Sequence, residues 1–368
     1  MAVILSLEAL DTIVGHLRSE GLTVVGPVWR DGTIRLDEID GIAELPTGWT
    51  DDQDGGYYRL VELDRPEIFG HAAPAMPWKR WLYPERTLLV RAERHNGPVE
   101  IVAPHSEAPL LAFFGIRSCD LHAIGVLDRV FLDPADPEYA ARRDGVFIVA
   151  AACGRPGGTC FCASMGTGPA PTAGYDIALT ELWSDGRYEF LAAPGTERGE
   201  AVLDLVDSRP ANAEDEAAVD ALVGAAEASM GRYLDPTHPT AAARRYDHPH
   251  WDDVAARCLT CANCTLVCPT CFCSTTEDTT DLTGAVAERW RTWDSCFTLD
   301  FSYLAGAPLR ASARSRYRQW LLHKLVTWHD QFGVSGCVGC GRCITWCPVG
   351  IDLTAEIAAI AQEAGVST

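Results

Sequence analysis

The stretch CLTCANCTLVCP at residues 258–269 recurs with the same spacing as CVGCGRCITWCP at residues 337–348. Both have the form C-x2-C-x2-C-x3-C-P. Thiolates at positions i, i+3 and i+6 can wrap round one face of an iron–sulfur cube, and iron is a metal that prefers soft sulfur donors. In two-cluster ferredoxins, the fourth cysteine of each run ligates the other cluster. The repeated motif therefore predicts two [4Fe-4S] clusters with crossed ligands.

The crossed arrangement assigns four thiols to each cluster. The first cluster takes Cys258, Cys261, Cys264 and Cys347, and the second takes Cys337, Cys340, Cys343 and Cys268. The alternative from a different class is a zinc-binding structural module. Zinc sites usually combine two C-x-x-C pairs that each supply two ligands, and a run of four cysteines ending in Cys-Pro is not that pattern.

The two motifs lie far apart, with 68 residues between Cys268 and Cys337. An apolar stripe at helical spacing over residues 312–332 fills part of the gap. No strand pattern is evident after residue 250. These features predict that residues 246–368 form an all-α domain of the helical-ferredoxin type, which holds both clusters.

Residues 1–245 have a different pattern, typical of an α/β (or α+β) domain. Alternating and apolar runs predict a hairpin over 22–39, strands at 86–93, 109–116 and 145–152, and a strand pair near 177–193. Helical patterns cover 6–20, 118–131 and 213–234, whereas 40–80 is expected to be irregular. The Pro, His and Ala content of 235–250 suggests a linker before the second domain.

Two cysteines of this first domain each follow a predicted strand. Cys119 follows the strand at 109–116, and Cys153 follows the strand at 145–152 and opens the loop CGRPGGTCFC at 153–162. In open α/β sheets, ligands gather at the carboxyl ends of the strands. Cys119, Cys153, Cys160 and Cys162 could therefore hold a third [4Fe-4S] cluster. The alternative is a set of buried free thiols with a chance C-x-C.

Three cysteines remain after these assignments: Cys271, Cys273 and Cys296. They could line the ferredoxin-type domain, or ligate a site with a fourth ligand that is not cysteine, and no cluster is predicted there. Five tryptophans between residues 290 and 346 are expected to pack around the clusters and exclude water, instead of relaying electrons.

Composition excludes several functions. A net charge of −21 repels phosphate backbones, so no nucleic-acid partner is expected. No apolar stretch is long enough for a membrane span. No P-loop and no G-x-G-x-x-G after a strand is present, so no nucleotide site is predicted. Fifteen cysteines in tight C-x-x-C and C-x-C spacings, without a signal peptide, indicate metal or redox chemistry in the cytoplasm.

Five segments together carry a resemblance to a known family. They are FFGIRSCDLHAI (113–124), DPEYAARRDGVFIVAAACGRPGGTCFCASMG (136–166), RCLTCANCTLVCPTCFC (257–273), RTWDSCF (291–297) and CVGCGRCITWCPVGID (337–352). In this order they resemble the beta subunit of cytosolic NAD(P)-linked [NiFe]-hydrogenases, or sulfhydrogenases. The chain is also similar to the A subunit of anaerobic sulfite reductase.

The resemblance implies an electron-transfer subunit of a cytoplasmic oxidoreductase complex, with no catalytic site of its own. In such a complex, a flavin subunit takes electrons from NAD(P)H, and this chain passes them through its clusters. A small iron–sulfur subunit and the [NiFe] large subunit receive them. The sequence hardly separates the hydrogenase complex from the sulfite reductase complex.

Overall fold

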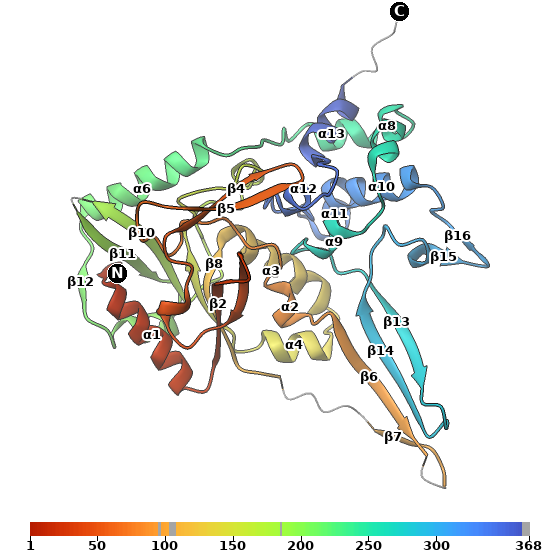
Figure 1. Ribbon diagram of the computed structural model, residues 1–368, viewed down its shortest axis with the longest axis horizontal. Helices are drawn as coiled ribbons and strands as arrows, with labels where there is room; N and C mark the ends of the chain where they lie inside the picture. The colour runs from red at the N-terminus through yellow and green to blue at the C-terminus, as the bar shows by residue number, and fades with distance from the viewer. Residues whose placement is uncertain (95–96, 103–107, 185, 363–368) are drawn as a thin grey trace, which may run out of the picture.

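The computed structural model describes residues 1–94, 97–102, 108–184 and 186–362. Figure 1 shows a body built on a large sheet, a group of helices at one side of it, and a long arm of strands that projects away from both. Within the described residues, no helix combines the length and the apolarity that crossing a membrane requires.

The body contains an eight-stranded mixed sheet. Its order is β12 (Ser208–Pro210), β1 (Val3–Leu5), β11 (Arg187–Pro194), β10 (Ile177–Ser184), β9 (Phe147–Ala151), β8 (Leu111–Arg117), β2 (Thr23–Arg30) and β3 (Thr33–Glu38). The four strands β10, β9, β8 and β2 are parallel. The flanking strands are antiparallel. The predicted hairpin over 22–39 thus forms one end of the sheet, and the predicted strand pair near 177–193 forms β10 and β11, beyond which β1 and β12 lie.

Helices cover both faces of this sheet, because its central strands are apolar on both sides. Along β8, Ala112 and Phe114 pack with α1 (Leu7–Ser19) on one face. Leu111 and Phe113 face α2 (Lys79–Leu82), α3 (Ser118–Phe131) and α4 (Pro137–Arg143) on the other. The remaining helices of this half are α5 (Glu197–Leu203) and α6 (Ala213–Ala228). Because β8 and β9 are parallel neighbours, their carboxyl ends lie side by side, and so do the cysteines that follow these two strands.

Residues 40–80 are more regular than expected. They contain a short 3₁₀ turn at Ile42–Glu44 and an antiparallel hairpin of β4 (Trp49–Asp54) and β5 (Tyr57–Glu62). The run WTDDQD in β4 has no apolar alternation, so strand patterning could not find it. This hairpin reaches the cysteine motifs, as described below.

The prediction that no strand follows residue 250 is wrong, and the all-α description of the second domain fails with it. The arm is a four-stranded antiparallel sheet in the order β13 (Ser274–Thr280), β14 (Val286–Trp293), β6 (Arg86–Glu93) and β7 (Glu100–Val102). Strand β13 has the sequence STTEDTT and is mostly exposed, so it carries no apolar period. Pairing with β14 holds it in place instead. A second small hairpin joins β15 (Tyr303–Leu304) to β16 (Ala307–Pro308).

Helices make up most of the rest of the C-terminal half. They are α7 (His238–Ala243), α8 (His250–Arg257), α9 (Asn263–Leu266), α10 (Ala313–Leu322), α11 (Trp328–Phe332), α12 (Arg342–Thr345) and α13 (Leu353–Ala361). A π-helical turn at His323–Thr327 joins α10 to α11, so the predicted helix over 312–332 is one interrupted rod. Ala242 of α7 shares a core with Ile357 of α13. The division at residues 245 and 246 stays a prediction.

Candidate iron–sulfur sites

The structure brings Cys258, Cys261, Cys264 and Cys347 together around one cavity, which we call the Cys258 pocket. Cys258 follows α8 directly, and Cys264 lies in the single turn of α9. The charges of the other three thiols act on Cys264. The first motif thus contributes three thiols to this cavity, and the second motif contributes Cys347, the fourth thiol of the crossed assignment, together with Cys343.

The walls of the Cys258 pocket are mainly apolar. They include Phe297, Tyr317, Trp320, Val349 and Ile351. Cys261 is exposed, so the pocket opens to the surface on that side. A backbone N–H, that of Thr260, donates to Cys258 Sγ at 3.4 Å.

A second cavity, the Cys337 pocket, is lined by the other predicted set: Cys268, Cys337, Cys340 and Cys343. Burial raises the pKa of Cys343 well above its usual value, and the charges of the other three thiols raise it further. Thiols in such a setting become thiolates only beside a strong cation. Cys343 also lines the Cys258 pocket, so the two cavities are neighbours.

Two buried lysines contact Cys268, and one of them, Lys324, lines the Cys337 pocket. Lys324 Nζ donates to Cys268 Sγ at 3.1 Å, and Lys79 Nζ donates to the carbonyl oxygens of Cys268 and Cys271 at 3.1 and 2.8 Å. Burial alone lowers the pKa of Lys324, but the nearby charges of Cys268, Cys271 and Cys337 raise it well above its usual value. Sequence patterning did not select either lysine. The signal was present, because they are the two lysines of the chain.

The four cysteines of the first domain also meet, at what we call the N-terminal thiol site (Cys119, Cys153, Cys160 and Cys162). Strands β8 and β9 are neighbours, so Cys119 at the start of α3 lies beside the loop that begins at Cys153. The charge of Cys162 acts on Cys119, and that of Cys153 acts on Cys160 and Cys162. The expectation that these two strand ends place the thiols together agrees with the geometry.

The N-terminal thiol site packs directly on the second motif. The Phe161 N–H donates to the Gly339 carbonyl at 2.8 Å, and Thr167 Oγ1 donates to the Val338 carbonyl at 2.7 Å. Cys160 Sγ lies 3.8 Å from the Cys340 carbonyl oxygen. The site therefore adjoins the Cys337 pocket, which shares Cys343 with the Cys258 pocket.

A buried ion pair fixes this contact. Arg342, which stands between Cys340 and Cys343, donates both terminal nitrogens to the Asp120 carboxylate at 2.9 and 2.7 Å. The two side chains are 2% and 1% exposed. Asp120 follows Cys119, so the pair ties the two sites together. The Asp120 carboxylate therefore joins the N-terminal thiol site to the second motif.

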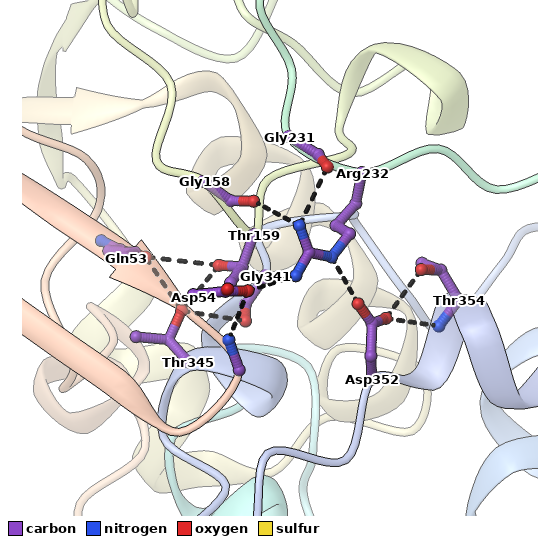
Figure 2. Close-up of polar contacts among 11 residues, drawn as sticks. Gln53, Asp54, Gly158, Thr159, Gly231, Arg232, Gly341, Thr345, Asp352 and Thr354 are labelled. Carbon is purple, nitrogen blue, oxygen red and sulfur yellow. Dashed lines mark hydrogen bonds and ion pairs between the residues drawn. The ribbon is translucent and has the colours of Figure 1, made fainter.

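A second joint links the β4–β5 hairpin to the motifs (Figure 2). Thr345 Oγ1 lies 2.9 Å from Gln53 Oε1 and 2.6 Å from Thr159 Oγ1. The Arg232 guanidinium lies between the carboxylates of Asp54 and Asp352, and it also donates to the Gly158 carbonyl at 3.0 Å. Polar side chains from four separate segments thus hold the loop of the N-terminal thiol site against the second motif.

Two further side chains beside Cys119 bind backbone carbonyl groups. Arg117 donates to the carbonyl oxygens of Phe69, His71 and Ala152, and His122 Nδ1 lies 2.9 Å from the Ser118 carbonyl. Of the leftover thiols, Cys271 is hydrogen-bonded to Cys268, and Cys273 is hydrogen-bonded to Cys296. A hydrogen bond from Cys296 lowers the pKa of Cys273 to about 7.

The donor sets fit iron–sulfur clusters. Each cavity presents the four thiols assigned to it, and the Cys337 pocket is also lined by Lys324, which forms no ion pair with a carboxylate among the described residues. Within the described residues, no three Cys, His, Asp or Glu side chains are grouped as ligands of one metal ion. A cubane has four irons, and each takes its own thiolate, so its ligands stand farther apart than those of a single ion.

Comparison with known proteins agrees with this donor set. Residues 257–351 match the family described as a 4Fe-4S dicluster domain. No solved structure gives a significant match. The sulfhydrogenase 2 subunit beta of Pyrococcus furiosus is 30% identical over 342 residues, which cover 89% of each chain. At that identity and coverage, the chain belongs to the family of iron–sulfur beta subunits of sulfhydrogenases.

Proposed function

We propose that this chain is the electron-transfer subunit of a cytoplasmic, NAD(P)-linked hydrogenase complex. The observation that carries the proposal is the pair of neighbouring cavities, each lined by three thiols of one motif together with the fourth cysteine of the other motif, in a chain of this family. Each set supplies a complete ligand shell, which favours electron transfer over substrate chemistry at iron.

The ligands that we propose are Cys258, Cys261, Cys264 and Cys347 for the first [4Fe-4S] cluster and Cys337, Cys340, Cys343 and Cys268 for the second. Such clusters supply one-electron carriers when bound. The chain's own residues hold the thiols in place and exclude water, and Trp320 lies in the wall of the Cys258 pocket for this purpose. A wall of this kind also tunes the potential through burial.

A third [4Fe-4S] cluster at the N-terminal thiol site is part of the proposal. Its support is the meeting of Cys119, Cys153, Cys160 and Cys162 at two strand ends, directly against the Cys337 pocket. Contact through the backbone of Cys340 gives an electron a short path between the two sites. Three neighbouring sites would make the whole chain, and not only its C-terminal part, an electron path.

The partners that we propose are a flavin subunit that binds NAD(P)H, a small iron–sulfur subunit and a [NiFe] large subunit. The sulfite reductase and zinc-module alternatives are not favoured, because the curated relative is a sulfhydrogenase subunit and the matched domain is a 4Fe-4S dicluster domain. Copurification with a [NiFe] large subunit tests the complex. Copurification with a siroheme protein instead would overturn the hydrogenase assignment.

Iron and acid-labile sulfide per chain, after anaerobic purification, test the clusters. About twelve of each supports three cubanes, and about eight supports two. The variant Cys160→Ser should lose about one cluster's share, about four irons. Unchanged iron in this variant would remove the third cluster from the proposal and leave the first two standing.

A further inference from the structure

The chain contains 30 basic side chains, and all but Lys79 and Lys324 are arginines. The two lysines are 3% and 5% exposed. They come from distant elements, the short helix α2 and the π-helical turn, and both reach the loop at 268–271. Lysine differs from arginine in carrying a compact charge with three rotatable donors. Its use at these two buried positions indicates a local need for that group.

Lys324 has three acceptors for its three donors. They are Cys268 Sγ at 3.1 Å, Thr270 Oγ1 at 3.0 Å and the Gly336 carbonyl at 3.2 Å. Lys324 lies in the π-helical turn, and its backbone carbonyl accepts a hydrogen bond from the Gly336 N–H at 2.8 Å. This bond fixes the backbone from which the Lys324 side chain projects. Such turns are frequent at functional sites. The ammonium is thus held in one position against a proposed ligand sulfur.

Lys79 supports the same loop from the other side. It contacts only carbonyl oxygens there, those of Cys268 and Cys271, and its ammonium lies 3.9 Å from the centre of the Trp293 ring. In the described part of the chain, no carboxylate forms an ion pair with either lysine. A buried cation without a counter-charge is costly. The thiolates and the cluster that they would hold are the negative charge available to both.

The Cys258 pocket has no comparable cation within hydrogen-bond distance of a ligand sulfur among the described residues. In that pocket, the Thr260 N–H, an uncharged donor, contacts Cys258 Sγ, and the walls are aromatic and aliphatic. Reduction adds negative charge to a cluster. A fixed positive charge and an N–H···S hydrogen bond therefore favour the reduced form and raise the reduction potential.

We propose that Lys324, with Lys79 behind it, holds the cluster of the Cys337 pocket at a higher reduction potential than the cluster of the Cys258 pocket. Lys324 is a positioning residue that acts through Cys268. An electron shared between the two clusters then resides mainly in the Cys337 pocket, next to the N-terminal thiol site. The inference rests on the proposed electron-transfer function, and it adds which of the two clusters has the higher reduction potential.

The test is a redox titration of the anaerobic, full-length protein, followed by electron paramagnetic resonance. The variant Lys324→Met should keep its iron and sulfide, and one of the cluster midpoints should shift downward while the others stay. Lys324→Arg, which keeps the charge, should recover part of the shift. Lys79→Met should move the same midpoint by less, because it reaches only carbonyl groups. Arg289→Met, which removes an exposed charge, is the matched control and should move nothing.

Full iron in Lys324→Met with every midpoint unchanged would overturn the inference and leave the proposed function intact. A downward shift of equal size in Arg289→Met would also overturn it, because net charge alone would then suffice. If Lys324→Met fails to fold, Lys324→Arg and Lys79→Met carry the test. In that case, an unchanged midpoint in Lys79→Met would contradict the inference. If Cys268→Ala keeps all of its clusters, the ligand assignment itself is refuted, and this outcome is distinct from a failure of the inference about Lys324.

Discussion

The Cys258 pocket and the Cys337 pocket are built on the same motif but have different surroundings. The residue before the third cysteine is Asn263 in one motif and Arg342 in the other. Asn263 donates to the Trp346 carbonyl and so stays within the motifs, whereas Arg342 reaches Asp120 of the N-terminal half. The motif therefore sets the donor atoms, and the rest of the chain sets the charges around them and the neighbours to which they connect.

The backbone shows the same contrast. Thr260 and Ala262 of the first motif and Gly339 and Gly341 of the second all have positive φ, from 50° to 74°. The first motif tolerates side chains in this conformation because its loop faces the surface. In the second motif, a Cβ on Gly339 would lie 2.7 Å from Cys162 backbone atoms. Packing of the N-terminal thiol site, and not φ alone, therefore requires glycine there.

The largest expected effect comes from breaking the crossed ligation. Cys268→Ala should remove the cluster of the Cys337 pocket, and Cys347→Ala should remove the cluster of the Cys258 pocket, although each residue lies in the other motif. Each variant should lose about four irons. Redox titration followed by electron paramagnetic resonance identifies the lost cluster. Loss of the Cys258-pocket signal in Cys268→Ala would show that each motif serves its own cluster.

The next effect concerns the ion pair that belongs to one pocket only. Asp120→Asn leaves the buried Arg342 charge without its partner, which should lower the stability by about 3–5 kcal/mol. The measurement is the urea concentration at which the visible cluster absorbance disappears under anaerobic conditions. Asp278→Asn, which breaks an exposed pair with Arg289, is the control and should shift this urea concentration much less. Equal losses in both variants would contradict a special role for the buried pair.

Much of this arrangement could be predicted from the sequence. The spacing of the cysteines predicted which thiols meet at each of the two cavities, and the apolar runs located β8, α3 and β9 to within a few residues. Polar elements escaped because nothing periodic marks them, as the STTEDTT strand β13 and the WTDDQD strand β4 illustrate. Contacts such as Arg342 with Asp120 join residues 222 positions apart, and single-sequence patterns hold no information on such pairs.

A smaller effect is expected from giving the second motif a side chain at Gly339. Gly339→Ala combines left-handed strain with a clash against the Cys162 backbone, so stability should fall by about 3 kcal/mol. The signal of the N-terminal thiol site should change as well, because the clash lies at that loop. The temperature at which the visible absorbance is lost, together with the resonance spectrum, measures both. A stable variant with an unchanged spectrum would show that the two loops are not in contact.

The smallest effect is the reverse change at the matching position of the first motif. Thr260→Gly removes the strain of a threonine at φ 50°, about 1 kcal/mol, while the greater freedom of glycine in the unfolded chain offsets part of that gain. The Thr260 N–H that donates to Cys258 Sγ remains. We therefore expect a rise in stability of less than about 1 kcal/mol and unchanged cluster midpoints. A loss of stability as large as that of Gly339→Ala would mean that the Thr260 side chain supports the Cys258 pocket. The loops of the two motifs would then differ for a reason other than the packing of residues 159–162 against the second motif.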